Sequence, residues 1–410
     1  MAASRTWFSD ARFGLFVHWG MYSLYERGEQ VLFREHLVPS EYRNRGAEFD
    51  PKRYDAREWA RLARDAGMRY AVLTAKHHDG FCLYDSQVSD LTSVKMGARR
   101  DLVAEYVGAF REAGLKVGLY FSLADWQWPA YFAGPERDPD GFARFVEYIH
   151  AQVRELCTGY GLLDVIWFDG VWPHSPEAWR SVDLLEMIRE LQPGILINNR
   201  AGLPGDFGTP EQRIEAESER PWESCITSVE RHWGYHAGER LWKTPEEIIH
   251  LLARIGEGGG NLLLNVGPRP DGTFPQPFVD LLREVGDWMR VNGSSLYGCT
   301  SGVCETISFG RMTVVGSTVY LHVLYWPGET LNLSGLKNRV LSARFLADGW
   351  SLDFSQEGDR LCLRNLPSLP PDPRNTVIAL EVEGEPAPYP WAAERLWNGD
   401  ANRMADWSRT

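Results

Sequence analysis

The sequence has few cysteines, no long apolar run and no excess of basic residues. Its six cysteines are scattered through 410 residues without a Cys-x-x-Cys pair, so a structural zinc site is not expected. No stretch approaches the roughly 18 consecutive apolar residues that a membrane-spanning helix needs. Lysine and arginine number 43 against 56 aspartates and glutamates, a net charge of −13. This balance disfavours nucleic-acid binding, which depends on a basic face.

The first twenty residues also lack the features of a secretory signal. Arg5, Asp10 and Arg12 interrupt them, which leaves no room for the apolar core of roughly 7–15 residues that such a signal needs. We therefore expect a cytoplasmic protein. In that reducing compartment the cysteines are expected to remain free thiols.

From residue 13 to about 293 the sequence alternates short apolar runs with amphipathic helical patterns. This alternation is typical of repeated βα units around a parallel sheet. Most of the apolar runs are continuous, as expected for strands buried on both faces. Seven or eight such units favour an α/β fold, a (β/α)8-like barrel of the TIM type, over residues 1–300. The expected strands cover residues 13–18, 70–76, 116–122, 164–169, 194–199, 222–227 and 261–266.

The pattern changes after residue 300. Residues 303–382 hold short β-rich runs separated by glycine, proline, asparagine and aspartate, which is typical of a β-sandwich. We therefore predict an all-β C-terminal sandwich domain over residues 301–385. The tail, residues 386–410, shows no clear period and stays unassigned.

Polar side chains follow almost every expected strand of the barrel. A lone strand-end aspartate often caps a helix, and a lone histidine is often a core residue. Five consecutive strands that end in this way point instead to a shared site, because the carboxyl ends of barrel strands meet at one mouth. The residues concerned are His18, His77, His78, Asp79, Tyr120, Asp125, Asp169, Asn198, Asn199 and Arg200.

Two kinds of chemistry suit these residue types. Three histidines and an aspartate, His18, His77, His78 and Asp169, could surround a metal ion. Neighbouring histidines on a strand point to opposite faces, however, which disfavours chelation by both. A sugar fits better, because its hydroxyls need polar partners and its ring faces pack on tryptophan.

Retaining glycoside hydrolysis requires one nucleophilic carboxylate and a second carboxyl that acts first as acid and then as base. Asp169, at the end of a buried strand, suits the nucleophile. The second carboxyl is expected in the loop after the fifth strand, which offers Glu211, Glu215, Glu217 and Glu223.

Several segments resemble the signature segments of the family 29 glycoside hydrolases, the retaining α-L-fucosidases. The similarity runs in order across about residues 7–300. It rests on FGLFVHWG at 13–20, AKHHDGF at 75–81, GLYFS at 118–122, WFDG at 167–170 and GGNLLLNVGP at 259–268. The β-rich region that follows has the position of the family's C-terminal sandwich.

The resemblance implies roles for individual residues. Asp169 would be the nucleophile that forms a covalent fucosyl-enzyme. Arg200 matches an arginine near the reacting centre, and Trp222 and Trp233 would form apolar walls for the C6 methyl group of fucose. The positions that hold fucose hydroxyls in the family are matched by His18, Glu29, His77, His78 and Tyr120.

The acid/base residue is the least constant feature of the family. Matching in order through residues 206–211 places it at Glu211, with Glu217 second and Glu223 third. Gln30 follows Glu29 where many members have tryptophan, so one aromatic wall is missing or comes from elsewhere.

We therefore expect an exo-acting α-L-fucosidase that cleaves a fucosylated oligosaccharide or glycoside with retention and needs no cofactor or metal. Two alternatives stay open: a fucose-binding protein with a decayed site, and a metal-dependent hydrolase that uses the strand-end histidines. No nucleic-acid or membrane partner is expected. The segment around Trp126 and Trp128, like the tail, forms either a subunit contact in a homo-oligomer or a leaving-group subsite.

Overall fold

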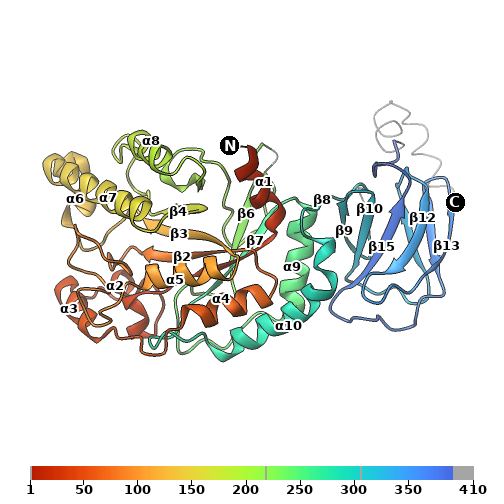
Figure 1. The fold of residues 1–410 in the computed structure, drawn as a ribbon, viewed down its shortest axis with the longest axis horizontal. Coiled ribbons are helices and arrows are strands. Elements are labelled where there is room, and N and C mark those ends of the chain that lie inside the picture. Colours follow the sequence, from red (N-terminus) through yellow and green to blue (C-terminus); the bar gives the residue numbers. More distant parts are fainter. Residues whose placement is uncertain (1, 218, 305–306, 391–410) are drawn as a thin grey trace, which may run out of the picture. The chain divides into compact units, whose positions relative to one another are not determined.

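The computed structural model describes residues 2–217, 219–304 and 307–390. The described chain divides into two compact units (Figure 1). The first holds the residues up to 245 and residues 260–290, and the second holds residues 246–259 and the described residues from 291 onward. Part of the unassigned tail, residues 391–410, lies outside the described residues.

The first unit is built around a seven-stranded parallel sheet with the strand order β5-β4-β3-β2-β1-β7-β6. Nearly all strand residues are buried, as their continuous apolar sequences require. Every expected strand of the barrel is present, although the fifth is short. The strands are β1 Phe13–Val17, β2 Tyr70–Lys76, β3 Lys116–Ser122, β4 Val165–Asp169, β5 Leu196–Ile197, β6 Glu223–Thr227 and β7 Asn261–Val266.

A segment without regular strand structure, residues 207–211, connects the two edges of this sheet. On one side Phe207 forms a parallel bridge with Asn198, just after β5. On the other side Gly208 and Glu211 form parallel bridges with Trp222 and Cys225. This closing segment takes the place of an eighth strand, which confirms the predicted TIM-like barrel.

Helices surround the curled sheet (Figure 1). Aspartates begin three of them: the Asp55 carboxylate accepts a hydrogen bond of 2.9 Å from the backbone N–H of Arg57, Asp101 accepts one of 2.8 Å from Ala104, and Asp138 accepts one of 2.9 Å from Gly141. The helices of this unit are α1 Ala2–Ala11, α2 Val31–Arg34, α3 Pro39–Asn44, α4 Ala56–Asp65, α5 Leu102–Glu112, α6 Pro129–Arg137, α7 Pro139–Gly159, α8 Ser181–Leu191 and most of α10 Gln276–Asn292, with 3-10 helices η1 Met21–Tyr25, η2 Arg45–Glu48 and η3 Asn199–Ala201.

The second unit contains two antiparallel sheets, one with the order β12-β15-β10-β9-β8 and one with the order β11-β14-β13. Apolar side chains from both sheets form one core, including Leu321, Leu333, Leu363 and Ile378, which confirms the predicted β-sandwich. The strands are β8 Thr300–Ser301, β9 Gly310–Val315, β10 Thr318–Val323, β11 Leu331–Ser334, β12 Val340–Phe345, β13 Asp353–Glu357, β14 Arg360–Arg364 and β15 Thr376–Val382. The 3-10 helix η4 Gly293–Ser295 precedes them.

Helix α9 Pro245–Glu257 groups with the β-sandwich, so the compact units follow a different division from the predicted boundary at residue 300. Its Glu257 accepts a hydrogen bond of 3.1 Å from the backbone N–H of Met312. Within the described ranges all six cysteines are free thiols, and none of the helices there is long and apolar enough to cross a membrane.

Candidate active site

The carboxyl ends of the barrel strands surround a cavity of about 290 Å³. Nine of the ten site residues expected from the sequence line it. They come from different strands and loops, which only the closed barrel brings together. These nine are His18, Glu29, His77, His78, Tyr120, Asp169, Arg200, Glu211 and Trp233.

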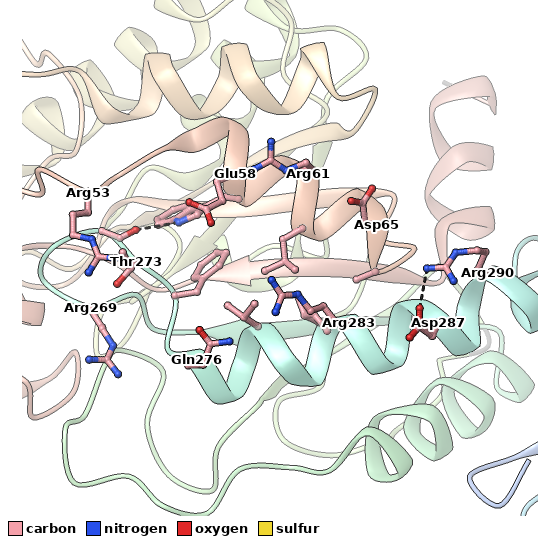
Figure 2. A pocket seen from close by; sticks show the side chains of 17 residues that line it. Arg53, Glu58, Arg61, Asp65, Arg269, Thr273, Gln276, Arg283, Asp287 and Arg290 are labelled. Atoms are coloured by element: carbon pink, nitrogen blue, oxygen red, sulfur yellow. Dashed lines mark hydrogen bonds and ion pairs between the residues drawn. The ribbon is translucent and has the colours of Figure 1, made fainter.

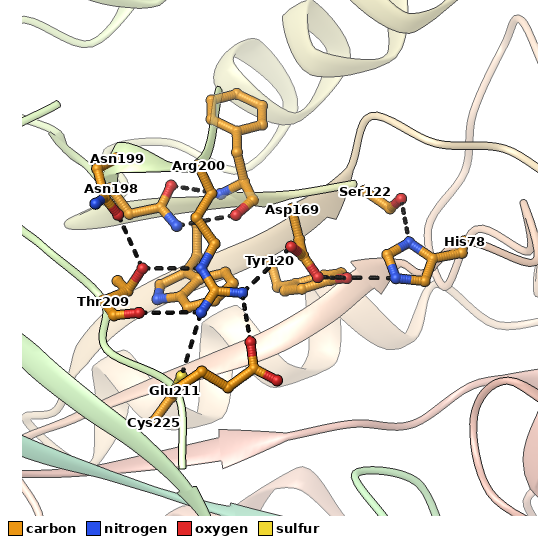
Figure 3. Close-up of polar contacts among 12 residues, drawn as sticks. His78, Tyr120, Ser122, Asp169, Asn198, Asn199, Arg200, Thr209, Glu211 and Cys225 are labelled. Carbon is orange, nitrogen blue, oxygen red and sulfur yellow. Dashed lines mark hydrogen bonds and ion pairs between the residues drawn. The ribbon is translucent and has the colours of Figure 1, made fainter. Parts of the chain in front are cut away.

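Asp169 ends β4, and its carboxylate lies within reach of Tyr120, Arg200 and His78 (Figure 3). Tyr120 donates a hydrogen bond of 3.1 Å to its Oδ2, and Nη1 of Arg200 lies 3.4 Å from its Oδ1. Burial alone would raise the pKa of Asp169, but Arg200, together with His78, the Gly170 N–H and Tyr120, holds it below the ordinary value. Asp169 is therefore ionised at neutral pH, the state that a nucleophile requires.

Arg200 is fixed from several sides. Its Nε donates to Oγ1 of Thr209 at 2.9 Å, and its Nη2 donates to the backbone oxygen of the same residue at 3.0 Å. The guanidinium carbon lies 4.7 Å from the ring centre of Trp167, a cation–π distance. Nη1 also donates to Oε2 of Glu211 at 2.8 Å. One arginine nitrogen thus contacts both carboxylates.

This shared contact limits the distance between the two acids. Nη1 lies 3.4 Å from Oδ1 of Asp169 and 2.8 Å from Oε2 of Glu211, so these two oxygens are at most about 6 Å apart. Retaining glycosidases need carboxyl groups about 5–5.5 Å apart, and inverting enzymes about 6.5–9.5 Å. The upper limit for this oxygen pair is compatible with the retaining separation.

The three histidines of the mouth are uncharged at neutral pH. Burial lowers the pKa of His18 to about 3 and that of His78 to about 4, and it lowers the pKa of His77 well below its ordinary value. The ring of His77 stacks on Tyr120 with centroids 5.6 Å apart. Neutral imidazoles suit the hydroxyls of a sugar, because a neutral ring keeps one nitrogen that can accept a hydrogen bond.

Glu29 holds the loop that carries Trp233. Its Oε2 accepts hydrogen bonds from the backbone N–H groups of Trp233, at 3.1 Å, and Gly234, at 2.9 Å. The Trp233 ring lies 5.1 Å from that of His18 and 6.0 Å from that of Phe16. Trp233 and Phe16 therefore supply apolar surface to the cavity.

Trp222 does not line the cavity, which corrects the prediction that it forms a wall for the methyl group. It lies at the amino end of β6, where its carbonyl accepts a hydrogen bond of 3.0 Å from the N–H of Asn261. Its ring packs so closely on Gly260 that a side-chain carbon there would lie 2.5 Å from it. A residue that precedes a parallel strand lies at the end of the barrel opposite the mouth.

The other two candidates for the acid are also placed away from the cavity. Glu217 forms an ion pair of 2.5 Å with Arg220. Glu223 is fully buried and accepts hydrogen bonds from Tyr70 and Trp167. Of the three, Glu211 alone lines the cavity, and its side chain is 43% exposed.

The structure adds residues that the sequence argument did not propose. Trp172 lines the cavity and is 51% exposed, so it supplies an aromatic surface at the mouth. Gln30 also lines the cavity but offers no aromatic ring. Ser122 and Asn265 contact two of the histidines. Their position at or near a strand end was a usable signal, since Ser122 ends β3 and Asn265 is the penultimate residue of β7.

A larger hollow of about 560 Å³ lies between α4 and α10 (Figure 2). It contains none of the strand-end residues. Its lining includes five arginines, Arg53, Arg61, Arg269, Arg283 and Arg290, together with the carboxylates of Glu58, Asp65 and Asp287. In the part of the chain that the structure describes, no three histidine, cysteine, aspartate or glutamate side chains converge as metal ligands.

Comparisons with known proteins agree with this geometry. The Alpha-L-fucosidase family matches residues 2–294. The tissue α-L-fucosidase of Homo sapiens is 31% identical over 403 residues, which cover 89% of this chain and 85% of that protein. The solved structure of α-L-fucosidase isoenzyme 1 from Paenibacillus thiaminolyticus has a TM-score of 0.88 and 41% identity, covering 93% of this chain and 99% of that one.

A second solved structure carries mechanistic information. It is a GH29 α-L-fucosidase from Bacteroides thetaiotaomicron, described as a trapped covalent intermediate in complex with 2-fluoro-fucosyl fluoride. Its TM-score is 0.87 at 28% identity, over 93% of this chain and 96% of that one. Because the family match spans most of the sequence, the chain belongs to the α-L-fucosidase family.

Proposed function

We propose that this protein is an exo-acting α-L-fucosidase that hydrolyses terminal α-L-fucosyl linkages with retention of configuration. The observation that carries the proposal is the pair of carboxylates, Asp169 and Glu211, joined by Arg200 within one cavity. The solved relative with a trapped covalent intermediate supports a covalent route.

In the first step, the ionised Asp169 attacks the anomeric carbon of fucose. The bond to the leaving oxygen breaks as Glu211 gives that oxygen a proton, and a fucosyl ester forms on Asp169. In the second step, Glu211 takes a proton from water, the water oxygen attacks the same carbon, and Asp169 leaves as a carboxylate. Two inversions at one carbon give net retention.

Recognition of fucose rests on the rest of the cavity lining. His18, His77, His78 and Glu29 face its hydroxyls, and Phe16 with Trp233 faces the methyl group at C6. An apolar wall of this kind favours a methyl over a hydroxymethyl group by about 1–3 kcal/mol. This preference separates fucose from galactose.

We also propose a cytoplasmic location. The free state of all six cysteines supports it, since reducing compartments keep thiols from forming disulfides. Cell fractionation with a soluble cytoplasmic marker tests it, and recovery of the protein with an exported fraction would reject it.

The test of the activity uses an aryl α-L-fucoside with the wild type and with Asp169→Gly. We expect turnover by the wild type, a loss of about 10³-fold or more in the variant, and recovery with azide that yields a fucosyl azide of inverted configuration. A wild type that binds L-fucose without cleaving any fucoside would reject the proposal in favour of a fucose-binding protein.

A further inference from the structure

The hydroxyl of Ser122 fixes the position of a hydrogen on His78. Its Oγ lies 2.7 Å from the carbonyl oxygen of Ala124 and 2.6 Å from Nδ1 of His78 (Figure 3 shows the second contact). A carbonyl oxygen can only accept, and a hydroxyl has a single hydrogen. Ser122 therefore donates to Ala124 and accepts from His78, so Nδ1 of His78 carries its hydrogen.

The amide of Asn265 acts on His18 in the same way. Its Nδ2 donates a hydrogen bond of 2.8 Å to the backbone oxygen of Trp233. This contact fixes the orientation of the amide and turns its Oδ1 toward Nδ1 of His18, at 2.6 Å. Because Oδ1 can only accept, Nδ1 of His18 also carries the hydrogen.

Both imidazoles are neutral, as their lowered pKa values show. A neutral imidazole has one N–H. With the hydrogen on Nδ1, the Nε2 atoms of His18 and His78 are left as bare acceptors, and both residues line the cavity.

The bare Nε2 of His78 lies near the proposed nucleophile, Asp169. Nε2 of His78 lies 3.7 Å from Oδ2 of Asp169, beyond the range of a hydrogen bond. Both atoms are acceptors, so no hydrogen bond joins them directly. A hydroxyl that lies between them and donates its hydrogen would satisfy one of the two.

We propose that Ser122 and Asn265 are positioning residues that set the direction of hydrogen bonding in the sugar site. They fix His78 and His18 as acceptors, so the cavity selects ligands whose hydroxyl groups donate. The inference deepens the proposed function, because it names the hydrogen-bond character that a bound fucose must present.

The first test reads the hydrogens directly. Nitrogen-15 NMR of the full chain labelled at histidine, at neutral pH and without ligand, distinguishes a protonated from a bare ring nitrogen. We expect the Nδ1–H form for both His18 and His78. An Nε2–H form for either one would overturn the inference.

The second test uses ligands with altered hydroxyls: L-fucose, its monodeoxy analogues and its monofluoro analogues. Fluorine cannot donate, and opposite a bare nitrogen it is worse than a hydrogen atom. At the two positions that face His18 and His78 we expect the fluoro analogue to bind more weakly than the deoxy analogue, by about threefold or more. Fluoro analogues that bind at least as well at every position would overturn the inference.

A pair of variants separates this role from a purely structural one. Ser122→Ala removes the acceptor for Nδ1, so the hydrogen of His78 is expected to move to Nε2 and the affinity for L-fucose to fall about tenfold. Ser122→Thr keeps the hydroxyl and should keep the Nδ1–H form. An Nδ1–H form in folded Ser122→Ala would overturn the role of Ser122.

Failure of the proposed function and failure of the inference give different results. If the wild type cleaves no fucoside, the proposed function is rejected, and the NMR spectrum still reports the imidazole hydrogens. If the wild type cleaves fucosides but shows Nε2–H histidines, the inference alone is rejected.

Discussion

Trp167 donates a hydrogen bond of 2.7 Å from Nε1 to Oε1 of Glu223, inside the barrel. The other carboxylate oxygen accepts a hydrogen bond of 2.5 Å from the hydroxyl of Tyr70. Trp167 lines the cavity and carries the guanidinium of Arg200 on its ring. Glu223 therefore fixes the position of Trp167, a residue of the cavity lining, without lining the cavity itself.

This placement predicts a pH-dependent effect on stability. Burial raises the pKa of Glu223 to about 7 in the folded protein, whereas an unfolded glutamate titrates near about 4.3. As the pH rises between these values, the unfolded chain loses the proton first, so folding stability falls, by about 4 kcal/mol at most, and levels off above about 7. Glu223→Gln removes this loss.

We therefore expect the free energy of unfolding of Glu223→Gln to exceed that of the wild type increasingly from about pH 4 to pH 7, measured by denaturant titration at several pH values. Fucosidase activity should persist, because Glu223 does not line the cavity. A loss of activity as large as that from removing Glu211 would show that Glu223 is the acid.

Glu211→Ala should remove proton donation to the leaving group. We expect kcat/KM to fall about 10²–10⁴-fold for a fucosyl disaccharide and much less for an aryl fucoside with an acidic phenol, which leaves without a proton. Steady-state kinetics on both substrates provide the measurement.

The matched control is Glu217→Ala, which removes a carboxylate from the same loop that is paired with Arg220. It should behave like the wild type on both substrates. If Glu217→Ala shows the dependence on the leaving group and Glu211→Ala does not, the two assignments are reversed.

Arg200→Met removes the cation shared by both carboxylates. Because Arg200 lowers the pKa of Asp169, its loss raises that pKa, and the acidic limb of the kcat/KM profile should move to higher pH. We also expect kcat/KM at neutral pH to fall about 10²-fold, as a contact to the reacting centre is lost. An unshifted acidic limb would contradict the assignment, and Arg220→Met is the control.

A chelator distinguishes the fucosidase from the metal-dependent alternative. The proposed chemistry uses two carboxylates, and no three metal-binding side chains converge in the described ranges. Activity on an aryl fucoside should therefore be unchanged after dialysis against EDTA. A loss that zinc or another divalent cation restores would favour the metal-dependent hydrolase.

Much of the fold could be predicted because it depends on local patterns. The continuous apolar runs of β2, β3 and β7 mark strands that are buried on both faces, and polar residues that follow them mark the mouth. The closing segment, residues 207–211, has no such run, since it joins the barrel through isolated bridges. Its place between β5 and β6 follows from the closure of the barrel.

The residues of the candidate site also fall into two groups: those that their position on a strand predicts, and those that only contacts between distant residues identify. His18, His78 and Asp169 follow or end strands, so strand direction alone brings them to the mouth. Trp222 looked equally suitable, but it precedes its strand, and this puts it at the opposite end. The choice among Glu211, Glu217 and Glu223 depended on contacts between residues distant in sequence, such as Trp167 with Glu223.

The sequence by itself determined the barrel, the β-sandwich and the resemblance to α-L-fucosidases, and it predicted Asp169 as the nucleophile, because each depends on short motifs and their order. Only the tertiary structure decided which glutamate meets Arg200, which tryptophan reaches the cavity and which partners contact Nδ1 of His18 and His78. Those properties are set by a few hydrogen bonds across the barrel, and no local pattern specifies which distant side chain supplies the partner.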